Sequence, residues 1–191
     1  MIIAIKEKDK VVVGYSNVDY WLTISDKDTV DEENIAIKVS PTGKLFVMGA
    51  LNRTSDLFLY DDEFLSMEIS PQNIIRKVIP YIKDKLREKG KNKENEWDNA
   101  LIICDNESIY ALNCAFEFYE VDDYCCYGFK KETLQSVLDE NKGLPAEQRI
   151  LETINFMTKQ YKKDFFPLTI IDTKTKEFKH FYKGENIRWA F

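Results

Sequence analysis

The chain opens with two aliphatic runs, residues 2–6 (IIAIK) and 11–15 (VVVGY), which are separated by the charged residues 7–10 (EKDK). Runs rich in β-branched side chains favour strands, and the absence of polar alternation is typical of strands that are buried on both faces. The short charged stretch between them predicts a hairpin turn. We therefore expect the first residue of the chain to lie at the end of a core strand, inside a layered fold.

A further buried strand is predicted within residues 44–60 (KLFVMGALNRTSDLFLY). We expect residues 35–39 and 45–49 to form a hairpin across the turn at 40–43 (SPTG), where proline and glycine suit turn positions. Gly49 and Ala50 permit two backbones to approach closely, and Thr54 or Ser55 can cap a following helix. The apolar residues of 57–69 fit neither a helical nor a strand period, and we favour a short helix there. Residues 16–34 are polar and acidic apart from an aromatic anchor at 20–22, so we expect a loop.

The clearest helix signal begins at Ser70 and Pro71, because serine is a common N-cap and proline is tolerated at the first helical position. Apolar residues then recur at intervals of three and four up to residue 86, which predicts one buried stripe on a helix that ends near Lys89 and Gly90. We expect Pro80 to kink this helix. The charged residues 91–96 (KNKENE) are interpreted as an exposed connector.

The second half of the chain repeats the order of strands followed by helices. We expect strands at 100–104 and 109–118 with a turn between them, helices from 128 to 141 and from 145 to 162, and a closing hairpin of strands 168–172 and 177–182. This order predicts an α+β fold of antiparallel sheets covered by helices, in one domain over residues 1–191. A four-layer αββα sandwich of two antiparallel sheets fits it; a two-layer α+β domain is also compatible with periodicity alone.

The composition limits the possible partners and locations. With 33 acidic and 27 basic residues the formal charge is −6, which argues against a broad nucleic-acid or anionic-membrane surface. We expect no membrane partner, because no apolar run approaches the roughly 20 residues that span a bilayer. The first residues lack a positively charged leader, so we expect a cytoplasmic location.

Four cysteines and one histidine do not predict a metal site. Cys104, Cys114, Cys125 and Cys126 lack the paired spacing of zinc ligands, and His180 lies far away in the sequence. We expect Cys104 and Cys114 to be buried free thiols within strands. The adjacent Cys125 and Cys126 fit a strand end between tyrosines, with redox activity as the alternative. No cofactor is expected.

Several segments, in this order, resemble the proteasome β-type and related bacterial peptidase subunits of the N-terminal-nucleophile (Ntn) hydrolase superfamily. They are the opening hairpin MIIAIKEKDKVVVGYS, the turn GALNRTSDLF, the helical segment YGFKKETLQSVLDENKGLPAEQRILETINFM and the strand region PLTIIDTKTKEF. The resemblance covers almost the whole chain. It implies the αββα sandwich, and it favours this fold over the two-layer alternative.

The resemblance also implies a mechanism and a set of site positions. In this family an N-terminal threonine attacks a peptide carbonyl, and its own α-amino group, with an unperturbed pKa of roughly 7.7 to 8.0, serves as the general base. Lys38 falls where the supporting lysine of the third strand is expected. Ser16 occupies approximately the place of the family's aspartate, with Asp19 just beyond. Gly128 is similar to the oxyanion region, and Asp164 matches an acidic residue before a late strand.

The residue that should attack is missing from this sequence. The resemblance puts Met1 or Ile2 at the nucleophile position, and neither side chain has a hydroxyl or thiol. No propeptide is expected, and Ile2 is bulky and β-branched, which favours retention of Met1. The leading hypothesis is therefore a noncatalytic structural or binding subunit. The alternatives are a hydrolase that uses Cys125, Cys126 or Ser16, and an unrelated α+β ligand-binding module.

Two further expectations follow from the resemblance and the charges. Related subunits stack helices between rings, so we expect a homo-oligomer, with a ring as its specific form. We also expect a protein or peptide partner, which the sequence does not identify. Lys38 also has a purely structural interpretation, as a strand-end lysine that is held by a neighbouring carboxylate such as Asp19 or Glu33.

Overall fold

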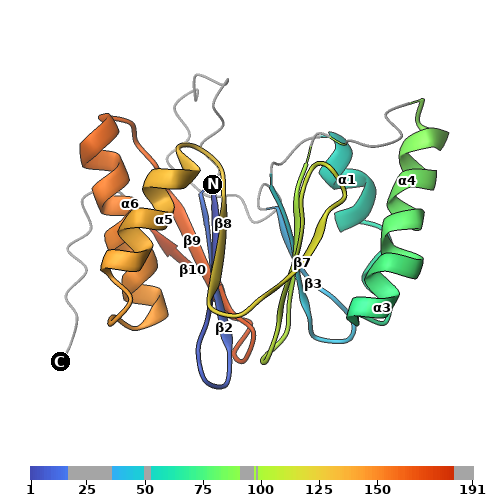
Figure 1. Ribbon diagram of the computed structural model, residues 1–191, viewed down its shortest axis with the longest axis horizontal. Helices are drawn as coiled ribbons and strands as arrows, with labels where there is room; N and C mark the ends of the chain where they lie inside the picture. The colour runs from blue at the N-terminus through green and yellow to red at the C-terminus, as the bar shows by residue number, and fades with distance from the viewer. Residues whose placement is uncertain (17–35, 50–52, 91–96, 98, 183–191) are drawn as a thin grey trace.

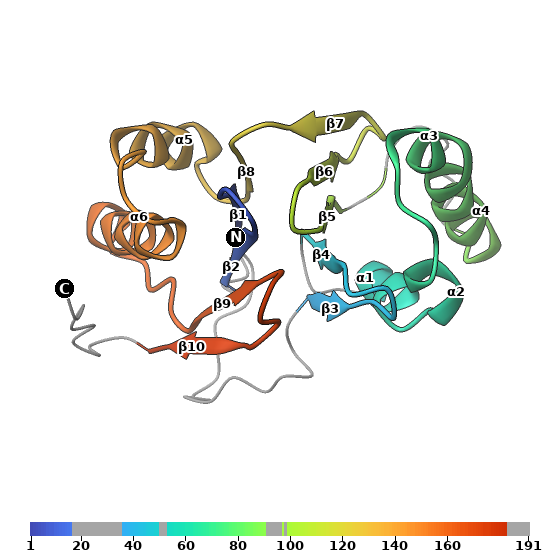
Figure 2. The ribbon, with the colours of Figure 1, turned by 90° about the horizontal axis from the view of Figure 1, so that it is seen from below.

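The protein is a four-layer sandwich in which two antiparallel sheets face each other and helices cover their outer faces (Figures 1 and 2). The computed structural model describes residues 1–16, 36–49, 53–90, 97 and 99–182. This α+β, αββα architecture is the predicted one, and the two-layer alternative is wrong. Several expected features lie outside the described residues: the loop at 16–34 apart from Ser16, the residues Asp19, Glu33 and Ala50, and the connector at 91–96.

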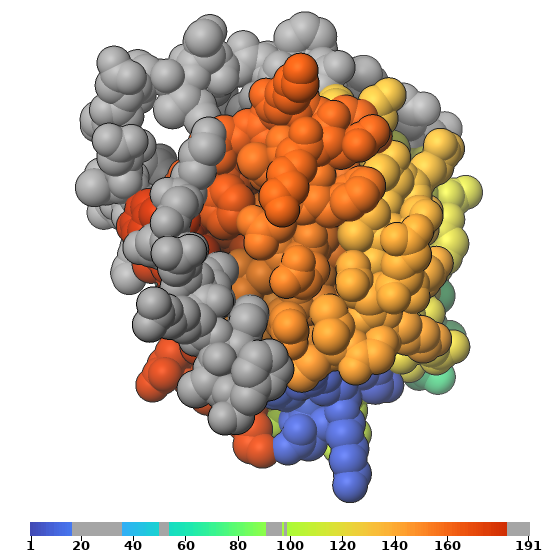
Figure 3. Space-filling view, turned by 90° about the vertical axis from the view of Figure 1, so that its left-hand side faces the viewer, coloured from blue at the N-terminus to red at the C-terminus, as the bar shows by residue number. Residues whose placement is uncertain are grey.

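The first sheet contains both ends of the described chain and has the strand order β10-β9-β2-β1-β8. The predicted opening hairpin forms its centre, because β1 pairs with β2 from Ile2 opposite Tyr15 to Lys6 opposite Val11. Its strands are β1 (Ile2–Lys6), β2 (Val11–Ser16), β8 (Tyr124–Tyr127), β9 (Leu168–Asp172) and β10 (Lys179–Phe181). Helices α5 (Lys131–Glu140) and α6 (Ala146–Tyr161) cover its outer face, where they lie side by side (Figure 3).

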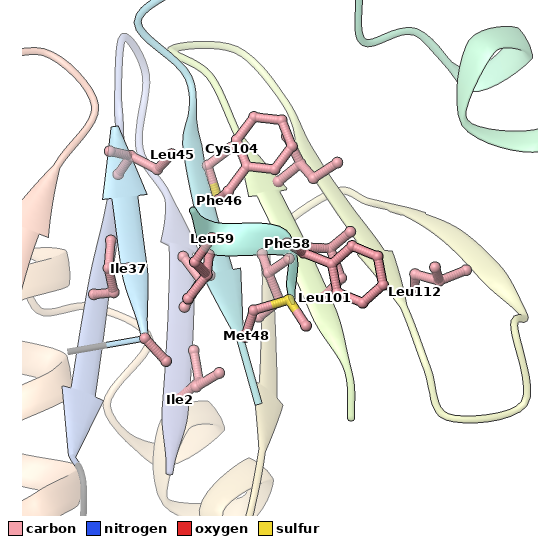
Figure 4. Packing of buried hydrophobic residues seen from close by; sticks show 14 of the residues in the cluster. Ile2, Ile37, Leu45, Phe46, Met48, Phe58, Leu59, Leu101, Cys104 and Leu112 are labelled. Atoms are coloured by element: carbon pink, nitrogen blue, oxygen red, sulfur yellow. The ribbon is translucent and has the colours of Figure 1, made fainter. Parts of the chain in front are cut away.

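The second sheet has the strand order β3-β4-β5-β6-β7. Its strands are β3 (Ile37–Val39), β4 (Leu45–Met48), β5 (Leu101–Cys104), β6 (Ile109–Leu112) and β7 (Phe118–Val121). It is covered by α1 (Arg53–Leu59), α2 (Asp62–Leu65), α3 (Pro71–Asn73), the π-helical turn η2 (Ile74–Val78) and α4 (Ile79–Glu88). All four residues of β4 are buried, because α1 and α2 pack on one face and the first sheet lies against the other (Figure 4).

The alternation of side chains along β1 divides its residues between the two cores. Ile2 and Ala4 belong to the cluster that lies between the sheets and continues under the helices of the second sheet, whereas Met1, Ile3 and Ile5 belong to the cluster under α5 and α6. Successive strand residues point to opposite faces, so this is the ordinary pleat of a strand that is buried on both sides. The unbroken apolar run at the start of the sequence is thereby explained.

The long helix at 70–89 begins as predicted but accommodates its proline differently. The Ser70 hydroxyl accepts a hydrogen bond from the Asn73 N–H at 3.2 Å, with Pro71 at the first helical position. Before Pro80 the helix widens into the π-helical turn η2. A π-turn is one of the recognised ways to absorb a disturbance of the hydrogen-bond ladder in a helix. Gly90, with φ +69, ends the helix.

Three local predictions are wrong. The strand expected at 109–118 ends at Leu112, because Asn113 turns the chain: its side-chain oxygen accepts from the N–H groups of Ala115 (2.9 Å) and Glu117 (3.0 Å). Strand β7 then returns beside β6, and Cys114 is exposed rather than buried. Helix α1 starts at Arg53, so Thr54 and Ser55 lie inside its first turn rather than at its cap. The uncertain segment 57–69 contains the end of α1 and then α2, which Asp61 caps.

The chain crosses from one sheet to the other between β7 and β8, and a buried arginine anchors this crossing. The side chain of Arg149 on α6 is only 2% exposed. Its Nε donates to the Leu138 carbonyl at 2.8 Å and its Nη1 to Asp123 at 3.2 Å, while Lys142 contacts the other Asp123 oxygen at 3.1 Å. The crossing is thereby fastened to both helices of the first sheet. None of the helices in the described ranges is long and apolar enough to cross a membrane.

Replacement of Gly14 by alanine should destabilise the protein by about 1–3 kcal/mol, the usual cost of overpacking. A Cβ at Gly14 would lie 2.5 Å from Cγ2 of Ile150, a stiff β-branched side chain on α6. Chemical denaturation measures the loss. Gly143→Ala is the matched control, because a Cβ there meets nothing within 4 Å. A Gly14→Ala variant as stable as this control would contradict the packing described here.

Asp123 should make the free energy of unfolding depend on pH in the acidic range. Partial burial opposes its ionisation, but hydrogen bonds and charges from Lys142 and Arg149 prevail and lower its pKa. A lowered folded-state pKa adds stability above the unfolded value of about 3.9, and this is lost as pH falls through the folded value.

We therefore expect Asp123→Asn to cost about 1 kcal/mol at neutral pH, a modest value because the carboxylate side chain is 37% exposed. The difference from the natural protein should shrink between about pH 5 and pH 3 in denaturation curves. The exposed Asp122→Asn is the control, and an equal pH-independent loss in both variants would refute the role of Asp123.

Candidate functional site

The candidate site lies at the end of β1, where the first residue meets the ends of β2 and β8. The α-ammonium group of Met1 donates to the Ser16 carbonyl at 2.6 Å, and the Ser16 N–H donates back to the Met1 carbonyl at 2.8 Å. Gly128 follows β8 with φ +127, and a Cβ there would lie 3.0 Å from the Met1 Cα. Only glycine combines this φ with such a close approach. Three of the predicted positions therefore meet here.

A fourth predicted position, Asp164, is connected to this site through Phe165, the next residue in the chain. The Ser16 hydroxyl donates to the Phe165 carbonyl at 2.7 Å, which ties the end of β2 to the segment before β9. The Asp164 carboxylate accepts from the Phe166 N–H at 3.1 Å and thereby shapes this segment. Phe165 is also buried against Phe129, with ring centroids 5.9 Å apart. No pattern in the sequence indicated the role of the Phe165 carbonyl.

Lys38 is not part of this group. It pairs with Phe46 across β3 and β4, and cross-strand partners share a face. The Phe46 ring packs on Phe64 of α2 at 5.4 Å, so that face is the one covered by helices. The ammonium group of Lys38 accordingly lies over the ring of Tyr60, 4.3 Å from its centroid. The side chain points away from the first sheet.

Apolar side chains occupy the positions that face the space between the sheets. By the pleat of β3, the neighbour of Lys38 that points toward the first sheet is Ile37, opposite Val47. On β1 the corresponding residue is Ile2, which is 0% exposed. Figure 4 shows Ile2 and Ile37 within the same buried cluster. Ile2 and Ile37, which point into this space, therefore offer neither a hydroxyl, a thiol nor an ammonium group.

The alternative nucleophile Ser16 lacks the surroundings that activate a hydroxyl. Its side chain is buried, and its proton is engaged with a backbone carbonyl that cannot act as a base. The histidine of the chain, His180, instead forms a hydrogen bond with Thr169 at 3.1 Å between β10 and β9. Ser16 therefore closes the β2 end of the sheet, and within the described residues its hydroxyl donates to a carbonyl rather than to a general base.

The alternative thiol nucleophiles are held in their protonated form. Burial raises the pKa of Cys125 to about 12 and that of Cys126 to about 11, and the nearby Lys131 offsets only part of this. Burial also raises the pKa of Cys104 far above its usual value. The thiolate is the reactive form, so these cysteines are poor nucleophiles at neutral pH. Across the described part of the chain, no three His, Cys, Asp or Glu side chains are grouped to hold a metal ion.

Comparison with solved structures identifies the fold. BPH from Thiobacillus denitrificans superposes with a TM-score of 0.69 at 11% identity, over 90% of this chain and 96% of BPH, and BPH in complex with epoxomicin gives the same values. Anbu (ancestral beta-subunit) from Yersinia bercovieri has a TM-score of 0.63 at 11% identity, over 97% of this chain and 88% of Anbu. No protein-family profile and no curated protein matches the sequence. The chain has the proteasome-like Ntn-hydrolase fold, and the ligand-binding module of unrelated fold is wrong.

We expect Cys114 to react with a mild electrophile at neutral pH well before the other three cysteines, because it alone among them is exposed. Mass spectrometry of peptides after timed labelling measures the four rates. Cys114→Ser should abolish the fast phase, and unfolding in denaturant should make the remaining thiols react. Rapid stoichiometric labelling of Cys125 or Cys126 in the folded protein would instead support the hydrolase alternative.

Proposed function

We propose that this protein is a noncatalytic, proteasome-like Ntn-fold protein that acts as a structural or binding subunit. The main support for the proposal is that Ile2, the first strand residue that faces the space between the sheets, is apolar and fully buried. Ser16, Gly128 and Asp164 are then vestigial site positions that now organise the chain terminus. Lys38 is a further vestigial position by resemblance, with its present contact to Tyr60.

The chemistry of this class of hydrolase supports the proposal. One residue must supply both the nucleophile and its own amine base, held together, because this geometry replaces a separate histidine. Met1 offers an amine that donates to the Ser16 carbonyl, and its side chain is packed under α5 and α6. The Ile2 side chain points into the space between the sheets, but it has no hydroxyl or thiol that could attack a substrate. The two requirements therefore fall on two residues, neither of which satisfies both.

We further propose that the protein self-associates, in a ring, in the cytoplasm, and binds a protein or peptide partner. The similarity to Anbu, which is described as an ancestral beta-subunit, supports assembly. Light scattering at tens of micromolar should show a discrete oligomer. A strict monomer under these conditions would remove the ring from the proposal and leave the noncatalytic site as it stands.

Epoxomicin tests the noncatalytic proposal directly, because BPH forms a complex with it on the same fold. We expect no epoxomicin adduct in the intact mass of this protein and no turnover of peptide substrates, with BPH as the positive control for the compound. An adduct on this chain would overturn the proposal, and the modified peptide would show which residue attacks.

Replacement of Ile2 by threonine separates the missing hydroxyl from the missing lysine. Threonine is small enough for the initiator methionine to be removed, so the mature variant should begin with the introduced threonine. We expect a loss of about 2–4 kcal/mol in stability, from lost apolar volume and a buried hydroxyl, and still no peptidase activity, because Ile37 supplies no ammonium group. Denaturation, intact mass and a peptidase assay measure the three outcomes. Ile2→Val, which largely keeps the packing and adds no hydroxyl, is the control; substantial activity in Ile2→Thr would refute the assignment of Ile37.

A further inference from the structure

Strand β7 is an open edge of the second sheet. It pairs on one side with β6, from Leu112 opposite Phe118 to Ile109 opposite Val121. On its other side the described residues supply no backbone partner. Figure 2 shows β7 at the margin of the molecule, between α5 and α3. Alternate N–H and C=O groups of an edge strand point away from the sheet and can pair with another extended chain.

The sequence of β7 protects this edge only in part. The strand is short and carries one charged residue, Glu120, but its four residues (FYEV) include no lysine or proline. Its residues instead favour strand pairing, because three of the four are aromatic or β-branched. Tyr119 and Glu120, whose side chains lie on opposite faces of the strand, are both exposed. By contrast, the opposite sheet ends in β10, which carries Lys179.

The electrostatic character of the edge is negative. Residues 117–123 (EFYEVDD) contain four acidic residues and no basic one. Only Asp123 has its charge balanced within the described chain, by Lys142 and Arg149. Hydrogen bonds from Tyr119 and Asn113 lower the pKa of Glu117, which therefore stays ionised at neutral pH. Glu120 and Asp122 are exposed on the other face of the strand.

We propose that the β7 edge binds an extended, positively charged segment of a partner protein, which adds a sixth strand to the second sheet. Backbone hydrogen bonds would supply the affinity of such strand addition, and alternate side chains the specificity. Lysine or arginine on either face of the added strand would meet a carboxylate, Glu117 on one face and Glu120 on the other. A second copy of β7 is a poor occupant, because the pairing would oppose like charges.

The probe is a short, end-capped, fluorescent peptide of alternating lysine and valine. We expect saturable binding that weakens with salt, together with new protection of the backbone amides of residues 118–121 in hydrogen exchange. The same peptide with glutamate in place of lysine should not bind. A lysine–valine peptide that is N-methylated at alternate residues keeps the charge but cannot pair, and it should lose the binding.

Variants locate the site. Glu117→Lys and Glu120→Lys should each weaken binding roughly 3-fold, and together about 10-fold. These effects are modest because an exposed charge pair contributes less than about 1 kcal/mol. Glu88→Lys, at an exposed position on α4, is the matched control and should bind normally; circular dichroism checks that each variant is folded. Equal binding of the N-methylated peptide, protection away from β7, or concentration-dependent protection of β7 without peptide would each overturn the proposal.

Discussion

The burial of β1 on both faces is the constraint on which the rest of the structure depends. Its odd residues pack under α5 and α6 and its even residues pack against the second sheet, so both cores meet along one strand. The close approach of α6 to Gly14 and the capping of α6 by Glu7, whose carboxylate accepts from the Ala146 N–H at 2.7 Å, fix the helices against the same hairpin. The first residues therefore carry the packing of the molecule, and a reactive polar group at Ile2 would have to be buried within it.

The fold was largely predictable from the sequence, because its strongest signals are local. The opening hairpin, the Ser70–Pro71 helix start and the apolar stripes of α5 and α6 each follow from spacing and turn chemistry, and the structure has them. Periodicity failed at Asn113, where regular alternation continues through a residue whose side chain forms a tight turn with its own backbone. It also missed the π-turn before Pro80, since the sequence shows that a proline must be accommodated but not how.

The sequence predicted that several of the named residues lie together at the end of β1, but not the face on which Lys38 lies. The resemblance brought Met1, Ser16 and Gly128 to one end of the sheet, and the structure joins them by hydrogen bonds and a close backbone contact. Lys38 shows the limit: successive residues of a strand point to opposite faces, and spacing alone did not predict that Lys38 lies on the face covered by helices. That distinction required the contact between Phe46 and α2, which joins segments far apart in the sequence.

The proposed noncatalytic role rests on Ile2, an apolar, fully buried residue that faces the space between the sheets. The intact mass of the purified protein, with sequencing of its first residues, tests this most directly. We expect a chain that begins Met1-Ile2, because bulky Ile2 prevents removal of the methionine. A mature chain that begins with an internal threonine, serine or cysteine would place a nucleophile beside a free amine and would contradict the account.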